Sequence, residues 1–119
     1  MKRNRFFPAV VLAALAFAAT AFAQSIPVAS SNLSSTITAT NTFQLIQGQT
    51  NNRIGCTIQN NGSHTMYVYP DIVANATTGG SAVLAPGDKF YCAVSGNFVL
   101  KNAISITGTA GDSYFANFQ

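Results

Sequence analysis

The sequence is poor in charged residues, and their scarcity argues against most catalytic and metal sites. Its acidic residues are Asp71, Asp88 and Asp112, it has one His, and Glu and Trp are absent. Each Asp follows Pro or Gly at a turn, where its side chain ordinarily bonds backbone amides rather than flanking a glycosidic bond. The Gly-x-Ser-x-Gly sequence of many hydrolases is missing, and no Asp-rich loop offers calcium its oxygen ligands. We therefore expect no enzyme, no metal and no cofactor.

The chain after residue 23 also has no excess of basic over acidic residues. Of the six basic residues, three lie within the first five positions, and the remaining three are Arg53, Lys89 and Lys101. Three basic residues minus three Asp leave no net charge after residue 23. Binding to nucleic acid depends on a basic surface that neutralises phosphates. We therefore expect no nucleic-acid partner.

The one long apolar run lies at the start of the chain and indicates an export signal. Residues 1–23 combine a basic start, an apolar stretch over about residues 6–19, and small residues at Ala21 and Ala23, as a cleavable signal requires. The alternative is a membrane helix, but the run is rich in Ala and shorter than the ~20 apolar residues of a span. We expect cleavage before Gln24 and a periplasmic, cell-surface or secreted protein that is not inserted in the membrane.

Only two cysteines are present, Cys56 and Cys92. In an exported small domain an even pair of cysteines ordinarily forms a disulfide. Both fall on apolar faces of predicted strands, which favours a buried bridge between facing or neighbouring strands. The alternatives, a metal site or a reactive thiol, would need a third group nearby. His64, the one histidine of the chain, gives little support for either.

Hydrophobic residues recur with a period of two after residue 34, as in half-buried strands. Residues 24–34 carry Pro27 and a Ser/Asn cluster and are expected to be extended, followed by one domain over residues 35–119. The pattern predicts an antiparallel β-sandwich, jelly-roll-like or immunoglobulin-like, of about eight short strands. We expect them near residues 36–40, 43–46, 53–60, 65–69, 82–84, 89–94, 98–100, 103–107 and 113–118.

Turn residues separate these strands. Within residues 53–60, Ile54, Cys56 and Ile58 share one predicted face. Asn61-Gly62 follows, a dipeptide that tolerates the positive φ values of hairpin turns, so residues 53–60 and 65–69 are predicted to pair as a hairpin. Further structural turns are expected at Pro86-Gly87 and at Gly111-Asp112.

Tyr67 and Tyr69 are candidates for a binding surface, with His64 beside them in sequence. They alternate with Met66 and Val68, so both tyrosines point outward if the latter two face the core. Adjacent exposed aromatic rings stack on sugars or fill a partner's surface. The alternative is an aromatic pair that simply covers the sheet, and for His64 a solvated loop residue.

Residues 53–112 carry a series of short motifs. They are Arg53-x-x-Cys-x-Ile-x-Asn60, Tyr-Val-Tyr at 67–69, Leu-Ala-Pro-Gly at 84–87 and Ile-Ser-Ile-x-Gly-Thr-Ala-Gly-Asp at 104–112. In this order they resemble small β-sandwich proteins of tailed-phage virions and related bacterial surface proteins. The resemblance implies a non-catalytic structural or binding module. Virion proteins assemble in the cytosol and carry no export signal, so this chain would be an exported relative.

These observations together predict a structural, adhesive or assembly subunit of the cell envelope or extracellular space. Its partner is expected to be another protein or a second copy of this chain, because a surface without net charge does little to prevent association. The polar N-terminal segment is a candidate for strand addition to a neighbour's sheet. The alternative is a module that binds carbohydrate or another small ligand through Tyr67, Tyr69 and the loop 71–81.

Overall fold

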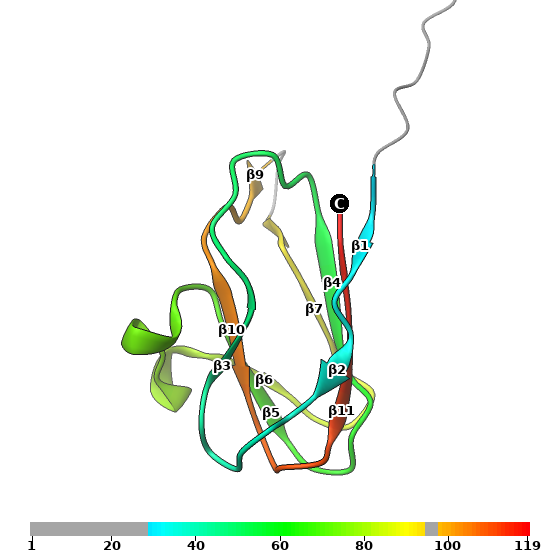
Figure 1. Ribbon diagram of the computed structural model, residues 1–119, viewed down its shortest axis with the longest axis vertical. Coiled ribbons are helices and arrows are strands. Elements are labelled where there is room, and N and C mark those ends of the chain that lie inside the picture. Colours follow the sequence, from blue (N-terminus) through cyan, green and yellow to red (C-terminus); the bar gives the residue numbers. More distant parts are fainter. Residues whose placement is uncertain (1–28, 95–97) are drawn as a thin grey trace, which may run out of the picture.

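The computed structural model describes residues 29–94 and 98–119, which form two antiparallel β-sheets packed against each other (Figure 1). The predicted β-sandwich is confirmed. The expected signal at 1–23 and residues 24–28 of the expected extended segment lie outside the described residues. The strands are β1 (Ser31–Asn32), β2 (Ser35–Thr36), β3 (Gln44–Gln47), β4 (Cys56–Asn60), β5 (Met66–Tyr69), β6 (Ala82–Leu84), β7 (Lys89–Tyr91), β8 (Ala93–Val94), β9 (Phe98–Val99), β10 (Ile104–Thr107) and β11 (Ser113–Phe118).

Most successive strands lie in different sheets. One sheet, called sheet A, has the order β1-β11-β4-β7, with β2 also paired to β11, and the other, sheet B, has the order β3-β10-β5-β6. A short ladder of β8 and β9 stands apart. The chain therefore crosses the sandwich between β2 and β3, β3 and β4, β4 and β5, β6 and β7, and β10 and β11 (Figure 1).

Alternate residues of the central strands fill the space between the sheets. The side chains of Ile58, Met66, Val68, Ile104 and Ile106 have no exposed surface. Each fully buried aliphatic side chain contributes about 1.5–3 kcal/mol to the stability of the fold. Period-two burial along β4 and β5 is why these two strands could be predicted from the sequence.

The predicted hairpin between residues 53–60 and 65–69 is wrong. Strand β4 pairs with β11 and β7, whereas β5 pairs with β10 and β6. The buried faces of the two strands, carrying Ile58 and Met66, oppose each other across the sandwich instead of lying in one sheet. Neither Asn61 nor Gly62 has a positive φ. The dipeptide therefore belongs to a connection between the sheets and not to a tight hairpin turn.

Asn60 organises this connection from inside the core. Its side chain is fully buried, and its Nδ2 donates to the carbonyl oxygens of His64 at 2.7 Å and Leu84 at 2.9 Å. Its Oδ1 accepts the amide of Gly62 at 2.9 Å. Glycine is required at position 62 because the backbone there lies close to the side chain of Asp112. A Cβ on residue 62 would lie 2.5 Å from the Cβ of Asp112.

The prediction that Ile54 shares a face with Cys56 and Ile58 is also wrong. Ile54 is 53% exposed, and its neighbour Arg53 is buried instead. The amides of Ile54 and Gly55 both donate to the carbonyl oxygen of Gln119, so two residues oppose one, as in a β-bulge. The bulge interrupts the alternation, and regular pairing begins at Cys56.

Two other predicted turns have glycine at a positive φ. Gly87 has φ of 88°, and the amide of Asp88 donates to the carbonyl oxygen of Ala85 at 2.9 Å, which closes a turn through Pro86. Gly111 has φ of 90°, and the Asp112 amide closes the corresponding turn from Thr109. Glycine takes such angles at no steric cost.

The beginning of the described chain forms one edge of sheet A. Ser31 pairs with Phe118 and Ser35 with Tyr114, and between them the Leu33 amide donates to the carbonyl oxygen of Ala116 at 2.8 Å. The alternation over residues 36–40 suggested a longer strand than β2, which ends at Thr36. Ile37 beyond it is buried, and the chain then turns toward sheet B.

Candidate functional site

Tyr67 and Tyr69 lie on the outer face of sheet B. They alternate along β5 with Met66 and Val68, which have no exposed surface, while both tyrosines are half-buried. The ring of Phe43 meets that of Tyr69 edge-on, with 6.4 Å between centroids. Such edge-to-face pairs stabilise by about 0.5–1.5 kcal/mol beyond the area that they bury.

This outer face carries apolar side chains on β3, β5 and β6, on either side of the polar residues Ser105 and Thr107 of β10. Ser105 on β10 pairs with Leu45 on one side and Tyr69 on the other, and Tyr67 pairs with Val83 on β6. Leu45 is 51% exposed and Val83 60% exposed. We call Leu45, Tyr67, Tyr69 and Val83 the sheet B patch. None of its four members is charged.

The loop between β5 and β6 folds against one end of the patch. It contains two short 3-10 turns, Val73–Asn75 and Thr78–Gly80, and projects from the side of sheet B (Figure 1). The Ser105 hydroxyl donates to the carbonyl oxygen of Asp71 at 2.8 Å, which fixes the start of the loop. A Cβ on Gly80 would lie 2.9 Å from the ring of Tyr69, so the end of the loop is also close to the patch.

The carboxylate of Asp71 is held within this loop. It accepts the amide of Ile72 at 2.7 Å and the Nδ2 of Asn75 at 3.1 Å. These bonds, that from Asn75 first, outweigh desolvation and lower the pKa of Asp71 below its usual value. The carboxylate is therefore bonded within the loop that follows β5.

The third predicted surface residue, His64, lies away from the tyrosines in the connection between β4 and β5. Its Nδ1 is 3.0 Å from Oδ2 of Asp112, and the hydroxyl of Ser63 is 3.2 Å from the same nitrogen. A Ser-His-Asp triad needs the hydroxyl and the carboxylate on opposite ring nitrogens. Because both share Nδ1 here, the three side chains do not have the arrangement of an acyl-transfer site.

Asp112 closes the connection between the two sheets. Its carboxylate accepts the amides of Ser63 at 3.3 Å and His64 at 3.2 Å. Desolvation raises the pKa of Asp112, but the hydrogen bonds from Ser63 and His64, with the charge of His64, outweigh it and lower the pKa below its usual value. Asp88 similarly accepts the amide of Ala85 within its own turn. All three Asp side chains thus bond local backbone or loop groups.

The disulfide between Cys56 and Cys92 is present and buried. It joins the beginning of β4 to the residue after β7, which are neighbours in sheet A, with 4.9 Å between the Cα atoms. The Cys92 amide also donates to the carbonyl oxygen of Cys56 at 3.2 Å. The bridge therefore links adjacent strands within one sheet.

Arg53, which the strand pattern did not single out, is the most buried charge in the described chain at 2% exposure. Its Nε and Nη2 both donate to Oε1 of Gln47, at 3.0 and 2.7 Å. Its remaining donors reach three backbone carbonyls, those of Gly48, Leu100 and Asn102. In the sequence, Arg53 stood out only as the first residue of the motif over residues 53–60.

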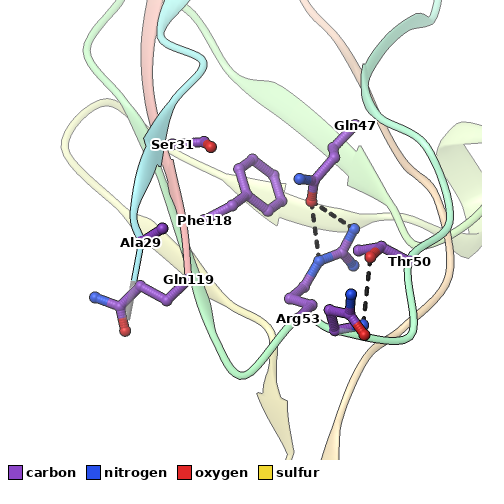
Figure 2. A pocket seen from close by; sticks show the side chains of 8 residues that line it. Ala29, Ser31, Gln47, Thr50, Arg53, Phe118 and Gln119 are labelled. Carbon is purple, nitrogen blue, oxygen red and sulfur yellow. Dashed lines mark hydrogen bonds between the residues drawn. The ribbon is translucent and has the colours of Figure 1, made fainter. Parts of the chain in front are cut away.

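The surroundings of Arg53 combine an aromatic ring with a small cavity. The guanidinium lies over the ring of Phe118, 5.1 Å from its centroid, and the side chain of Lys101 donates to the backbone carbonyl of Arg53. Burial lowers the pKa of Arg53 below its ordinary value. A cavity of about 160 Å³ lies beside it, lined by Ala29, Ser31, Gln47, Thr50, Asn52, Arg53, Phe118 and Gln119 (Figure 2).

Among residues 29–94 and 98–119, no three His, Cys, Asp or Glu side chains gather as a metal site would require. Within the same ranges, no helix has the length and apolar character needed to cross a membrane. The chain matches no family model, no curated protein and no solved structure. Its function must therefore be argued from the surfaces and centres described above.

Proposed function

We propose that this protein is an exported, non-catalytic subunit that acts by presenting its β-sheet surface, in a structural, adhesive or assembly role. The observation that carries this proposal is the character of sheet B. Its edge strands β3 and β6 contain no charged residue, and each exposes an apolar side chain, Leu45 or Val83. Edge strands that remain unpaired usually carry charges that prevent association, as Lys89 does on β7. The resemblance to virion β-sandwiches also favours a subunit without catalysis.

Self-association through the N-terminal segment is the most specific form of this proposal. Residues 31–37 lie on β11 as an edge strand, held through the Leu33 amide, the Ile37 amide and the buried Ile37 side chain. A second copy offers the same groups on its own β11, so the segment can bind a neighbour in the same register. Exchange of an identical element between copies is a low-cost route to assembly.

Cysteine crosslinking tests this exchange. Asn32 and Asn117 are register partners, so Asn32→Cys in one copy and Asn117→Cys in another should form a mixed dimer after incubation at high concentration. The matched control replaces Asn117→Cys by Ser113→Cys, whose partner is Thr36, about 13 Å further along the ladder. The proposal fails if the mixed dimer is no more abundant than the control and the native chain elutes as a monomer at every concentration.

Export is tested by the mass of the product. Expressed in a bacterium from its first Met, the protein recovered outside the cytosol should begin at Gln24 and be two daltons lighter than the dithiol form. Retention of residues 1–23 in a membrane fraction would instead favour an anchoring helix.

A second candidate function is carbohydrate binding at the sheet B patch and the loop 71–81. It is favoured by the two tyrosine rings on the outer face of sheet B and by the polar loop that ends against Tyr69 at Gly80, since sugars bind by stacking on aromatic rings and by hydrogen bonding to polar groups. A glycan array should then show saturable binding that Tyr67→Ala abolishes. Tyr91→Ala is the control, because Tyr91 is 55% exposed but lies on sheet A. An array without signal would remove this candidate.

A further inference from the structure

The turn over residues 39–42 joins the N-terminal segment on sheet A to β3 on sheet B (Figure 1). Among the residues that the structure describes, Asn41 in this turn is the one non-glycine residue with a positive φ, 55°. In this left-handed region the Cβ atom crowds the following carbonyl oxygen, a contact that Asn tolerates better than most residues but that glycine alone avoids. The backbone is therefore strained at Asn41 while the segment lies on its own β11.

A long hydrogen bond closes this turn. The Thr42 amide donates to the carbonyl oxygen of Ala39 at 3.3 Å, beyond the about 2.7–3.2 Å that is usual for such bonds. The Asn41 amide donates to the carbonyl oxygen of Gly108 at 3.0 Å, and a further bond joins the turn to Ala110. All four side chains of the turn are exposed. Opening the turn therefore gives up these bonds but uncovers none of the core.

The contacts that precede the turn can be formed equally well with a second copy. The Ile37 amide donates to the carbonyl oxygen of Asp112 at 2.9 Å, and the Ile37 carbonyl accepts the amide of Gly111 at 2.9 Å. The Thr38 amide donates to Oε1 of Gln44 at 2.8 Å. A neighbouring copy presents the same three groups to an exchanged segment. The closed chain and the exchanged pair therefore differ in the turn and not in these contacts.

We propose that the turn over residues 39–42 is the hinge of this exchange, and that Asn41 sets how readily a chain gives its N-terminal segment to a second copy. The inference rests on the self-association proposed above. Opening extends the hinge and lets Asn41 take a negative φ, and short strained hinges of this kind favour exchange. Fully extended, the backbone from Thr38 to Phe43 spans about 17 Å, more than the ~10 Å between packed sheets. The segment can therefore leave its own sandwich.

Asn41→Gly and Asn41→Val should change the exchange in opposite directions. Glycine takes a φ of 55° without strain and should keep the turn closed, whereas Val, branched at Cβ, is strongly disfavoured there and prefers extended backbone. The two variants should differ about tenfold for each turn. A reciprocal dimer opens two turns, so its dissociation constant should differ about a hundredfold between the variants, with the native chain between them. Sedimentation velocity over a range of protein concentrations measures this constant.

Asn51→Val is the matched control for the added apolar surface, because Asn51 is another exposed turn residue but has no positive φ. It should dimerise as the native chain does. The crosslink between Asn32→Cys and Asn117→Cys, made in each background, shows whether the dimer is the exchanged one.

The outcomes separate the hinge from the exchange itself. If the crosslinked dimer forms to the same extent with Asn41→Gly and Asn41→Val, the exchange stands but this turn is not its hinge. A dimer fraction of Asn41→Gly equal to that of the native chain would contradict the hinge without reference to Asn41→Val. If every variant stays a monomer at all concentrations and gives no crosslink, the proposed self-association fails and the hinge with it.

Discussion

Replacing both cysteines by alanine should cost this domain a large part of its stability. Cys56 and Cys92 are separated by 36 positions, so the disulfide closes a loop of about 37 residues. The chain-entropy relation assigns such a loop ~4 kcal/mol at 25 °C. Both sulfur atoms are also buried, so the alanine variant loses packing in addition. The free energy of unfolding of a native domain is typically about 5–15 kcal/mol in total, so the alanine variant should be close to the limit of folding.

Urea unfolding followed by circular dichroism measures this loss, since the chain has no Trp to report by fluorescence. With a slope of about 1 kcal/mol per molar urea, the midpoint should fall by ~4 M relative to the oxidised protein. Reduction of the unmodified chain is the control, because it opens the loop but leaves both sulfur atoms in place. If reduction lowers the free energy of unfolding by less than about 1 kcal/mol, loop closure is not what the bridge contributes.

Three further changes probe the connection between the sheets. Asn60→Asp places a carboxylate against two carbonyl oxygens in the core and should cost about 3 kcal/mol or more in urea unfolding at neutral pH, whereas Gln59→Glu beside it should cost under about 1 kcal/mol. The pKa of Asp112 is lowered in the folded protein, so its contribution to folding stability is fully present above the ordinary Asp pKa and is lost as the pH falls through the folded pKa. Asp112→Asn should therefore flatten the acid side of the curve of unfolding free energy against pH. An unchanged curve would contradict this role of Asp112. Gly62→Ala forces a contact of 2.5 Å and should lower the unfolding free energy by about 1–3 kcal/mol, while Gly79→Ala, with open space around it, should leave the melting temperature nearly unchanged.

Local alternation was sufficient to predict which side of β5 faces the core. Met66 and Val68 face the core and Tyr67 and Tyr69 face outward, because the pleat of a strand fixes which side each residue occupies. The cysteine pair could likewise be predicted, since two cysteines permit one pairing. These features depend on neighbours in sequence and on composition, which are visible without a fold.

Features that depend on distant partners could not be predicted. The sequence Asn61-Gly62 has the composition of a hairpin turn, yet β4 pairs with β11 and β5 pairs with β10, so both flanking strands find their partners far along the sequence. The bulge that buries Arg53 depends on Gln119 in the same way. His64 and Asp112, 48 positions apart, come together only because β10 and β11 lie in different sheets.

The position of β11 has a consequence for the order in which the fold can be assembled. This last strand of the sequence pairs with β1, β2 and β4, so three strands of sheet A have no common neighbour until it arrives. Strands β5 and β6, and β4 and β7, can pair before residue 113 has been made, but β1 and β2 have no partner until β11 follows. Long-range pairing of this kind is slow, and a product that ends before Ser113 cannot build this part of sheet A.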